Sequence, residues 1–108
     1  MDETSFKIVT AEEVQTRQQA NPDLLLLDVR TPEEWEEHHI PSATLLPMDT
    51  LIDRLEELDP ERETIVLCEH GLRSQSVAHY LVTQAGFRDV ASMEGGMSEW
   101  TGPVIRGA

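Results

Sequence analysis

The chain has 108 residues, with 21 aspartates and glutamates against eight lysines and arginines, and a net charge of −13. This length suits one hydrophobic core, so we expect residues 1–108 to form a single domain. The negative charge disfavours nucleic acids and anionic membranes as partners. No apolar run is long enough to span a bilayer, and the first residues do not resemble a secretory signal, so a cytoplasmic protein is expected.

The first third of the chain predicts a strand, a helix and a second strand. We expect the first strand at 6–9. A capping box of Thr10 and Glu13 then opens a helix that ends before Pro22. The continuous apolar run at 24–29 is typical of a central parallel strand that is covered on both faces.

A second capping box, formed by Thr31 and Glu34, predicts a short helix directly after this strand. We expect Trp35 to pack that helix onto the core. Asp28 and Arg30 stand at the end of the strand, where they could serve as a catalytic acid and cation. A satisfied structural ion pair is the interpretation that we favour, because charged groups at buried positions usually pair.

The remaining elements continue the alternation of strands and helices. Leucines at helical spacing predict a helix at 49–58, after a short strand at 44–46. A third apolar strand at 64–67 precedes a helix that Gly86 is expected to terminate. Strand 89–93, a flexible loop at 94–96 and a final helical turn complete the pattern. This alternation predicts an open parallel α/β sheet with helices on both faces.

Cys68, the only cysteine, stands directly after the strand at 64–67 and just before a predicted helix. Parallel α/β proteins use this arrangement to place a functional side chain at the carboxyl edge of the sheet. Gly71 allows the loop to curl so that successive N–H groups form a nest for an anion. The helix N-terminus and Arg73 add positive charge there. Since the thiolate is the reactive form of cysteine, the pattern indicates a nucleophile rather than a structural thiol.

A single cysteine allows no internal disulfide, which fits a reducing compartment. A thiol that resolves an oxidised or sulfur-loaded Cys68 must therefore come from another molecule. The adjacent His38 and His39 do not indicate a metal site, because neighbouring side chains of an extended chain point apart and no further ligand stands at suitable spacing. We expect neither a metal nor a cofactor.

Four stretches resemble the sequence signatures of the rhodanese-like (thiosulfate sulfurtransferase-like) family, and together they cover roughly residues 8–104. They are Leu27–Arg30 with Glu34-Trp35, His39–Ala43, Cys68–Ser74 and Gly86–Trp100. The resemblance implies a five-stranded parallel sheet and a persulfide mechanism. In such a mechanism Cys68 takes a sulfane sulfur from a donor, such as thiosulfate or a persulfide, and gives it to cyanide or a thiol.

The resemblance also implies that the loop after Cys68 binds the transferred sulfur. The residues carried over are Glu69, His70, Gly71, Leu72 and Arg73, whose N–H groups would hold the anionic outer sulfur. The acceptors implied are small thiols or cyanide, and the acidic surface adds a basic or thiol-bearing protein as a further partner. Glu69 stands where the family often has a basic residue, and a carboxylate there opposes a dianionic donor such as thiosulfate.

Two other functions stay open at the level of sequence. Cysteine phosphatases and arsenate reductases of related architecture have a loop that is longer by one residue between cysteine and arginine. The shorter spacing from Cys68 to Arg73 favours a single sulfur over a tetrahedral oxyanion. A non-catalytic rhodanese-like module that docks a basic protein is the second alternative, although such modules usually lack the cysteine.

Overall fold

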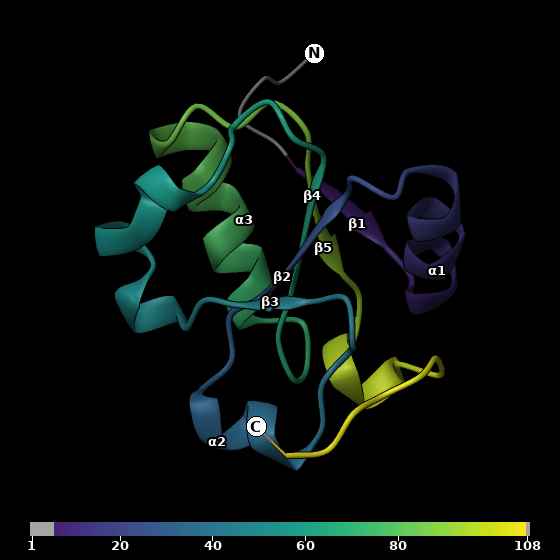
Figure 1. Ribbon diagram of the computed structural model, residues 1–108. Helices are drawn as coiled ribbons and strands as arrows, with labels where there is room; N and C mark the ends of the chain where they lie inside the picture. The colour runs from purple at the N-terminus through teal and green to yellow at the C-terminus, as the bar shows by residue number, and fades with distance from the viewer. Residues whose placement is uncertain (1–5, 108) are drawn as a thin grey trace.

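Five parallel strands organise the structure, a computed structural model that describes residues 6–107 (Figure 1). Their order across the sheet is β1-β5-β4-β2-β3, and every pairing is parallel. The expected open five-stranded parallel sheet is therefore confirmed. The strands are β1 Lys7–Val9, β2 Leu25–Asp28, β3 Thr44–Leu45, β4 Thr64–Leu67 and β5 Val90–Met93.

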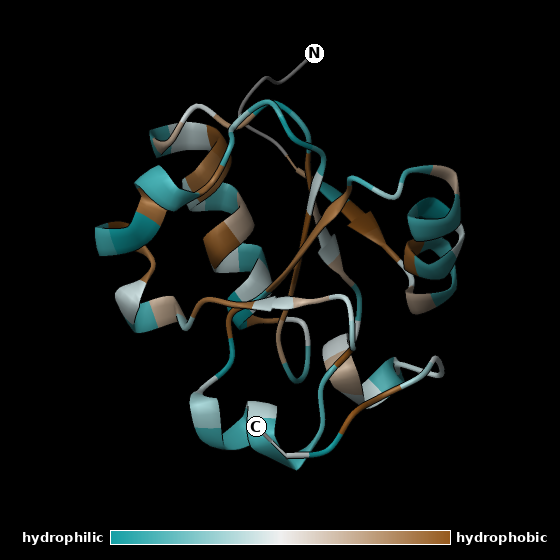
Figure 2. Ribbon diagram, in the orientation of Figure 1, coloured by the Kyte–Doolittle hydropathy of each residue, from teal (hydrophilic) through white to brown (hydrophobic). Residues whose placement is uncertain are grey.

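Helices lie on both sides of this sheet, as expected, with α1 (Ala11–Ala20) on one side and α3 (Arg73–Gln84) on the other (Figure 1). Successive strand residues point to opposite faces, so β2 and β4 each supply both cores. Leu27 and Val66 pack on the α3 side, whereas Leu26 and Ile65 pack on the α1 side. Figure 2 shows the hydrophobic residues gathered along these strands and the hydrophilic ones on the outer surfaces of the helices.

Both capping boxes form as the sequence predicts. The Thr10 hydroxyl accepts the N–H of Glu13, and the Glu13 carboxylate accepts the N–H of Thr10. The Thr31 and Glu34 pair opens α2 (Pro32–Glu37) in the same way. These motifs are local in sequence, so nothing in the tertiary structure has to be known to predict them.

The expectation that Trp35 packs α2 onto the core was wrong. No residue of α2 is fully buried. Trp35 is half-buried and stacks on the imidazole of His39, with ring centroids 3.7 Å apart and an angle of 6° between the planes. The His39 ring is fixed in turn by a 2.8 Å hydrogen bond with the Trp35 carbonyl. A helix of six mostly acidic residues has no apolar face to bury, and the ion pair of Glu34 with Arg73 holds it instead.

The helix expected at 49–58 is instead two 3₁₀ segments, η1 (Met48–Thr50) and η2 (Ile52–Glu57). Neither has a side-chain N-cap, and the N–H of Arg54 bonds to the carbonyl of Leu51 at 3.0 Å. A short uncapped segment nucleates an α-helix poorly, whereas 3₁₀ turns suit short connections. The expected apolar contacts survive, because Leu51, with the half-buried leucines at 55 and 58, packs on the α3-side core.

The second half of the chain follows the prediction closely. Gly86, with a φ of +74°, directly follows the C-cap of α3, and β5 comes next. The buried stripe of α3 is Ser74, Val77, Ala78 and Leu81, and Tyr80 is half-buried at its edge. Within residues 6–107, none of the helices has the length and apolar character that crossing a bilayer requires.

Candidate active site

Cys68 follows β4 at the carboxyl edge of the sheet and is 1% exposed. Its Sγ accepts two backbone hydrogen bonds, from the N–H of Gly71 and the N–H of Ser74, both at 3.2 Å. The loop therefore curls around the sulfur with amide donors pointing inward. Two N–H bonds to one sulfur stabilise negative charge on it, which is the electrostatic condition for a nucleophilic thiolate.

Gly71 makes this curl possible. Its φ is +89°, a region that side chains disfavour, and a Cβ at this position would lie 2.9 Å from the backbone nitrogen of Gly95. The other loop residues lie around the opening: Glu69 and Arg73 are half-buried, His70 is exposed, and Leu72 is 74% exposed. The backbone N–H groups of Glu69, His70, Leu72 and Arg73 have no acceptor in the described part of the chain.

A pair of buried serines extends the site behind the sulfur. The Ser74 hydroxyl lies 3.5 Å from the Cys68 Sγ and 2.7 Å from the hydroxyl of Ser92 on β5. Both serines are at most 1% exposed. The sequence reasoning did not single out either residue. The available signal was Ser92, a polar residue within a strand that is otherwise apolar, where a buried hydroxyl needs a partner.

The segment after β5 supports the loop from behind. The N–H of Met97 donates to the carbonyl of Cys68 at 2.9 Å, and the N–H of Ser98 donates to the carbonyl of Glu69 at 3.0 Å. Gly96 is buried with a φ of +59°, and a Cβ there would overlap the Cys68 carbonyl. The flexible loop expected at 94–96 is thus a packed turn that leads into η3 (Gly96–Glu99), and Gly96 is required by its close contact with the site.

A buried arginine neutralises the charges beneath the loop. Arg30, 1% exposed, bonds to the carboxylate of Asp28 at 2.8 Å and to that of Glu69 at 3.2 Å. Burial lowers the pKa of Arg30, but its hydrogen bonds with the two carboxylates raise it above the usual value. The structural ion pair expected for Asp28 and Arg30 is present. The Glu69 carboxylate is paired too, so it does not face the thiol as an uncompensated charge.

Arg73 is likewise engaged by a carboxylate. Its two terminal nitrogens donate to the two oxygens of Glu34, each at 2.8 Å, so that α2 is clamped to the start of α3. The same carboxylate caps α2 by accepting the N–H of Thr31. Hydrogen bonds from Arg73 outweigh burial and lower the pKa of Glu34 to about 2. Arg73 therefore lies beside the site as part of an ion pair rather than as a free cation.

Replacing Glu34 with glutamine should lower the melting temperature at neutral pH, with an effect that shrinks in acid. The carboxyl titrates near 4.5 in the unfolded chain and at about 2 in the folded one. Its stabilisation is therefore complete above pH 4.5 and is lost as the pH falls through 2. Thermal unfolding measured in steps from neutral pH to pH 2 should show the two proteins converge. The matched control is Glu33→Gln, an exposed neighbour on α2. A gap that stays constant down to pH 2 contradicts the clamp.

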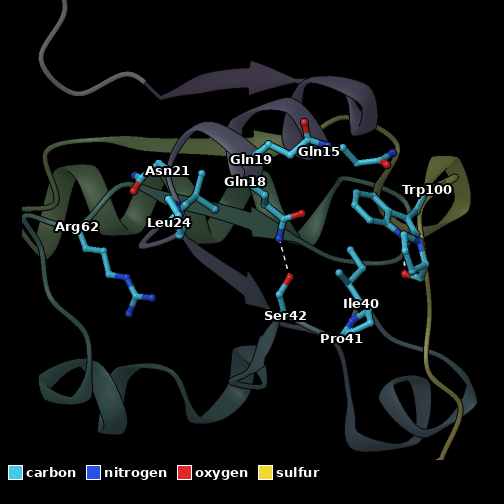
Figure 3. Close-up of a pocket in the computed structure, with 12 residues that line it drawn as sticks. Gln15, Gln18, Gln19, Asn21, Leu24, Ile40, Pro41, Ser42, Arg62 and Trp100 are labelled. Atoms are coloured by element: carbon cyan, nitrogen blue, oxygen red, sulfur yellow. Dashed lines mark hydrogen bonds between the residues drawn. The ribbon is translucent and has the colours of Figure 1, made fainter.

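A separate cavity of about 460 Å³ lies beside α1 (Figure 3). Glutamines of α1 line one side of it, and Ile40, Pro41 and Trp100 line another. Gln18 donates a hydrogen bond to the Ser42 hydroxyl across the cavity. No residue of the loop 68–73 lines this cavity. It therefore does not take part in chemistry at Cys68. Among residues 6–107 no group of three or more histidine, cysteine, aspartate or glutamate side chains could hold a metal ion.

Comparisons with known proteins agree with the fold. The family pattern described as "Rhodanese-like domain" matches residues 10–103. Thiosulfate sulfurtransferase GlpE of Pseudomonas syringae is 39% identical over 90% of this chain and 89% of its own length. The putative sulfurtransferase YtwF of Bacillus subtilis is 36% identical over 90% of this chain and 92% of its own.

A crystal structure of a rhodanese-like domain protein from Staphylococcus aureus superposes with a TM-score of 0.84 and 32% identity, covering 95% of this chain and all of the other. The family pattern spans most of the sequence, and the sulfurtransferase relatives match it over almost their whole length. The chain therefore belongs to the rhodanese-like family and is a sulfurtransferase of the rhodanese type.

Proposed function

We propose that Cys68 is the nucleophile and sulfur carrier, and that the loop 69–73 binds the transferred sulfur. The observation that supports this most directly is the pair of N–H bonds from Gly71 and Ser74 to Sγ. In the thiolate state the Ser74 hydroxyl can donate to Sγ as well and accept from Ser92, because either serine can be the donor in their hydrogen bond. The sulfur then has three donors aimed at it before any substrate arrives.

In the first step the Cys68 thiolate attacks the outer sulfur of a donor such as thiosulfate. A bond forms between Sγ and that sulfur, the sulfur–sulfur bond of the donor breaks, and sulfite leaves with the electron pair. The product is a persulfide on Cys68. The unpaired N–H groups of Glu69, His70, Leu72 and Arg73 are the donors available to the anionic outer sulfur.

In the second step a thiophilic acceptor attacks the outer sulfur, and the Cys68 thiolate is the leaving group. Cyanide gives thiocyanate, and a thiolate gives a new persulfide, so no external oxidant or reductant is required. One sulfur that serves both half-reactions predicts ping-pong kinetics. The acceptor has to come from another molecule, since Cys68 is the only cysteine of the chain.

The geometry favours this chemistry over phosphoryl or arsenate chemistry. Cys68 is 1% exposed, so a substrate has to present a small atom to Sγ rather than a bulky tetrahedral centre. Arg73 is held by both oxygens of Glu34 and is not free to clamp an oxyanion. The amide donors on Sγ also support a working thiol rather than a purely docking module.

Mass spectrometry after incubation with thiosulfate or a persulfide donor tests the proposal. We expect the intact protein to gain one sulfur, about 32 Da, and to lose it again on addition of cyanide. Cys68→Ser should show no gain, and His70→Ala, which changes an exposed loop side chain, should still load. Absence of an adduct with every donor, or loading of Cys68→Ser, would overturn the proposed role of this thiol.

Three broader expectations accompany this function. The whole chain, residues 1–108, acts as a single catalytic domain. The lone cysteine supports a reducing, cytoplasmic location. The partners are a small sulfur donor and a cyanide or thiol acceptor, and the net charge of −13 supports a basic thiol-bearing protein as one such acceptor.

A further inference from the structure

Large apolar side chains are exposed in the Cys68 loop and on the two 3₁₀ segments. Leu72, within the loop, is 74% exposed, and Ile52 and Met48 on the preceding 3₁₀ segments are 65% and 40% exposed. The segment 48–57 runs alongside α3, the helix that the Cys68 loop leads into (Figure 1). Single exposed apolar residues need no explanation, but several on neighbouring segments, one of them in a reactive loop, indicate a contact surface.

Two of them, Met48 and Ile52, border a hollow of about 240 Å³ between the 3₁₀ segments and α3. We call it the anchor hollow. Leu51 and Val77 form its buried floor, and its lining surface is mostly apolar. It has room for a side chain such as leucine or phenylalanine. The lining residues are Met48, Leu51, Ile52, Ser76, Val77 and Tyr80.

The anchor hollow begins one helical turn from Leu72 of the Cys68 loop. The N–H of Ser76, which lines it, bonds to the carbonyl of Leu72 at 3.4 Å. Residues four apart on a helix share a face, so Leu72, Ser76 and Tyr80 form one row that leads from the loop into the hollow. Leu72 itself lies between Gly71 and Ser74, whose N–H groups hold the Cys68 sulfur. A partner seated in the hollow would place neighbouring residues over the loop.

The surroundings of the anchor hollow are acidic. Asp49 and Asp53 on the same segment are exposed and form no salt bridge with any described residue. The nearby arginines are already paired, Arg54 with Glu57 and Arg73 with Glu34. With a net charge of −13 on the chain, the field at this surface selects a partner with lysine or arginine next to its apolar side chain.

We propose that the anchor hollow docks a protein acceptor whose reactive cysteine is flanked by a large apolar residue and by basic residues. The inference rests on the proposed function. The partner's thiolate attacks the outer sulfur of the Cys68 persulfide, the bond from that sulfur to Sγ breaks, and the Cys68 thiolate is released while the partner carries the persulfide. The apolar side chain in the hollow anchors the complex, and the acidic rim orients it.

Synthetic acceptor peptides test this proposal. One set carries a cysteine, a leucine two to six residues away and two lysines. The matched set has glycine in place of leucine and keeps both lysines. With persulfide-loaded wild-type protein, we expect the leucine–lysine peptides to reach a kcat/KM about tenfold above the matched set. The readout is the gain of one sulfur by the peptide, measured by mass spectrometry.

Ile52→Asp should abolish this preference, because it places a charge at the edge of the hollow. Ile8→Asp is the control, since Ile8 is 47% exposed on β1, at the edge of the sheet away from β2 and β3. Cyanide turnover should be equal in all three proteins. A preference that is absent, or that survives Ile52→Asp, overturns the inference.

Two further results separate the alternatives. Absence of cyanide turnover in the wild-type protein would overturn the proposed function itself, whereas cyanide turnover without a peptide preference overturns only the docking surface. Sedimentation of the wild-type and Ile52→Asp proteins reports self-association. Dimerisation that Ile52→Asp removes, without any peptide preference, would assign the hollow to a second copy of the chain and overturn the acceptor proposal.

Discussion

Replacing Arg30 with methionine should lower the free energy of unfolding by about 3–5 kcal/mol, measured by urea denaturation at neutral pH. Methionine preserves much of the length of the side chain but removes its charge. The Asp28 carboxylate, which is 0% exposed, then stays buried without a counter-ion, and Glu69 loses its partner. The cost comes mainly from this uncompensated charge rather than from the lost attraction.

Arg54→Met provides the matched control. Arg54 bonds to Glu57 at 2.9 Å, but these side chains are 43% and 53% exposed, so solvent screens the pair and its loss should change the stability little. Adding Asp28→Asn to Arg30→Met should recover part of the lost stability, because no buried charge is left at that position. Equal losses for Arg30→Met and Arg54→Met, or no recovery in the double variant, contradict the account of a buried charge network.

The sequence predicted the elements whose causes are local or periodic. The capping boxes at Thr10 and Thr31 depend on residues only three positions apart. The continuous apolar run at 24–29 indicates by itself a strand that is covered on both faces. The curl at Gly71 followed from one glycine three residues after the only cysteine. Each of these features is specified within a few residues, so the order of the strands did not have to be known.

The contacts that the sequence reasoning missed join segments that are far apart in the chain. Glu69 and Arg30, like Arg73 and Glu34, are 39 positions apart and meet because β4 lies beside β2 in the sheet. Ser92 reaches the site because β5 flanks β4 on the other side. The sequence therefore showed that Glu69 and Arg73 are charged, but not that each charge is neutralised by a partner. Because both are paired, neither side chain acts as a free charge toward an anionic donor.

A flexible loop was expected at 94–96, and this prediction was wrong for the same reason: the contacts that decide it join distant segments of the chain. Two adjacent glycines in a sequence are equally consistent with a flexible loop and with a turn that must approach another backbone closely. The distinction depends on Met97 and Ser98, whose N–H groups donate to the carbonyls of Cys68 and Glu69. The backbone at Gly96 thus helps to position the reactive loop, although nothing in the sequence marks this glycine as part of the site.

Gly71→Ala should lower kcat/KM for the sulfur donor by about 10²–10³-fold, the range for loss of one preorganised N–H donor. A Cβ at a φ of +89° is strained, and it would lie 2.9 Å from the Gly95 nitrogen. The loop has to shift to relieve both, which moves the Gly71 N–H away from Sγ. Stability should fall by only about 1–2 kcal/mol, because the strain is confined to one residue.

Gly86→Ala separates backbone strain from the loss of the donor. Gly86 has a φ of +74°, but a Cβ there meets nothing within 4 Å, and the residue lies beyond the far end of α3 from the sulfur. This variant should lose a similar amount of stability and keep the wild-type kcat/KM. If Gly71→Ala also keeps it, the amide nest is not what activates Cys68. If Gly86→Ala loses as much activity, the effect reports general destabilisation and the curl of the loop has no special role.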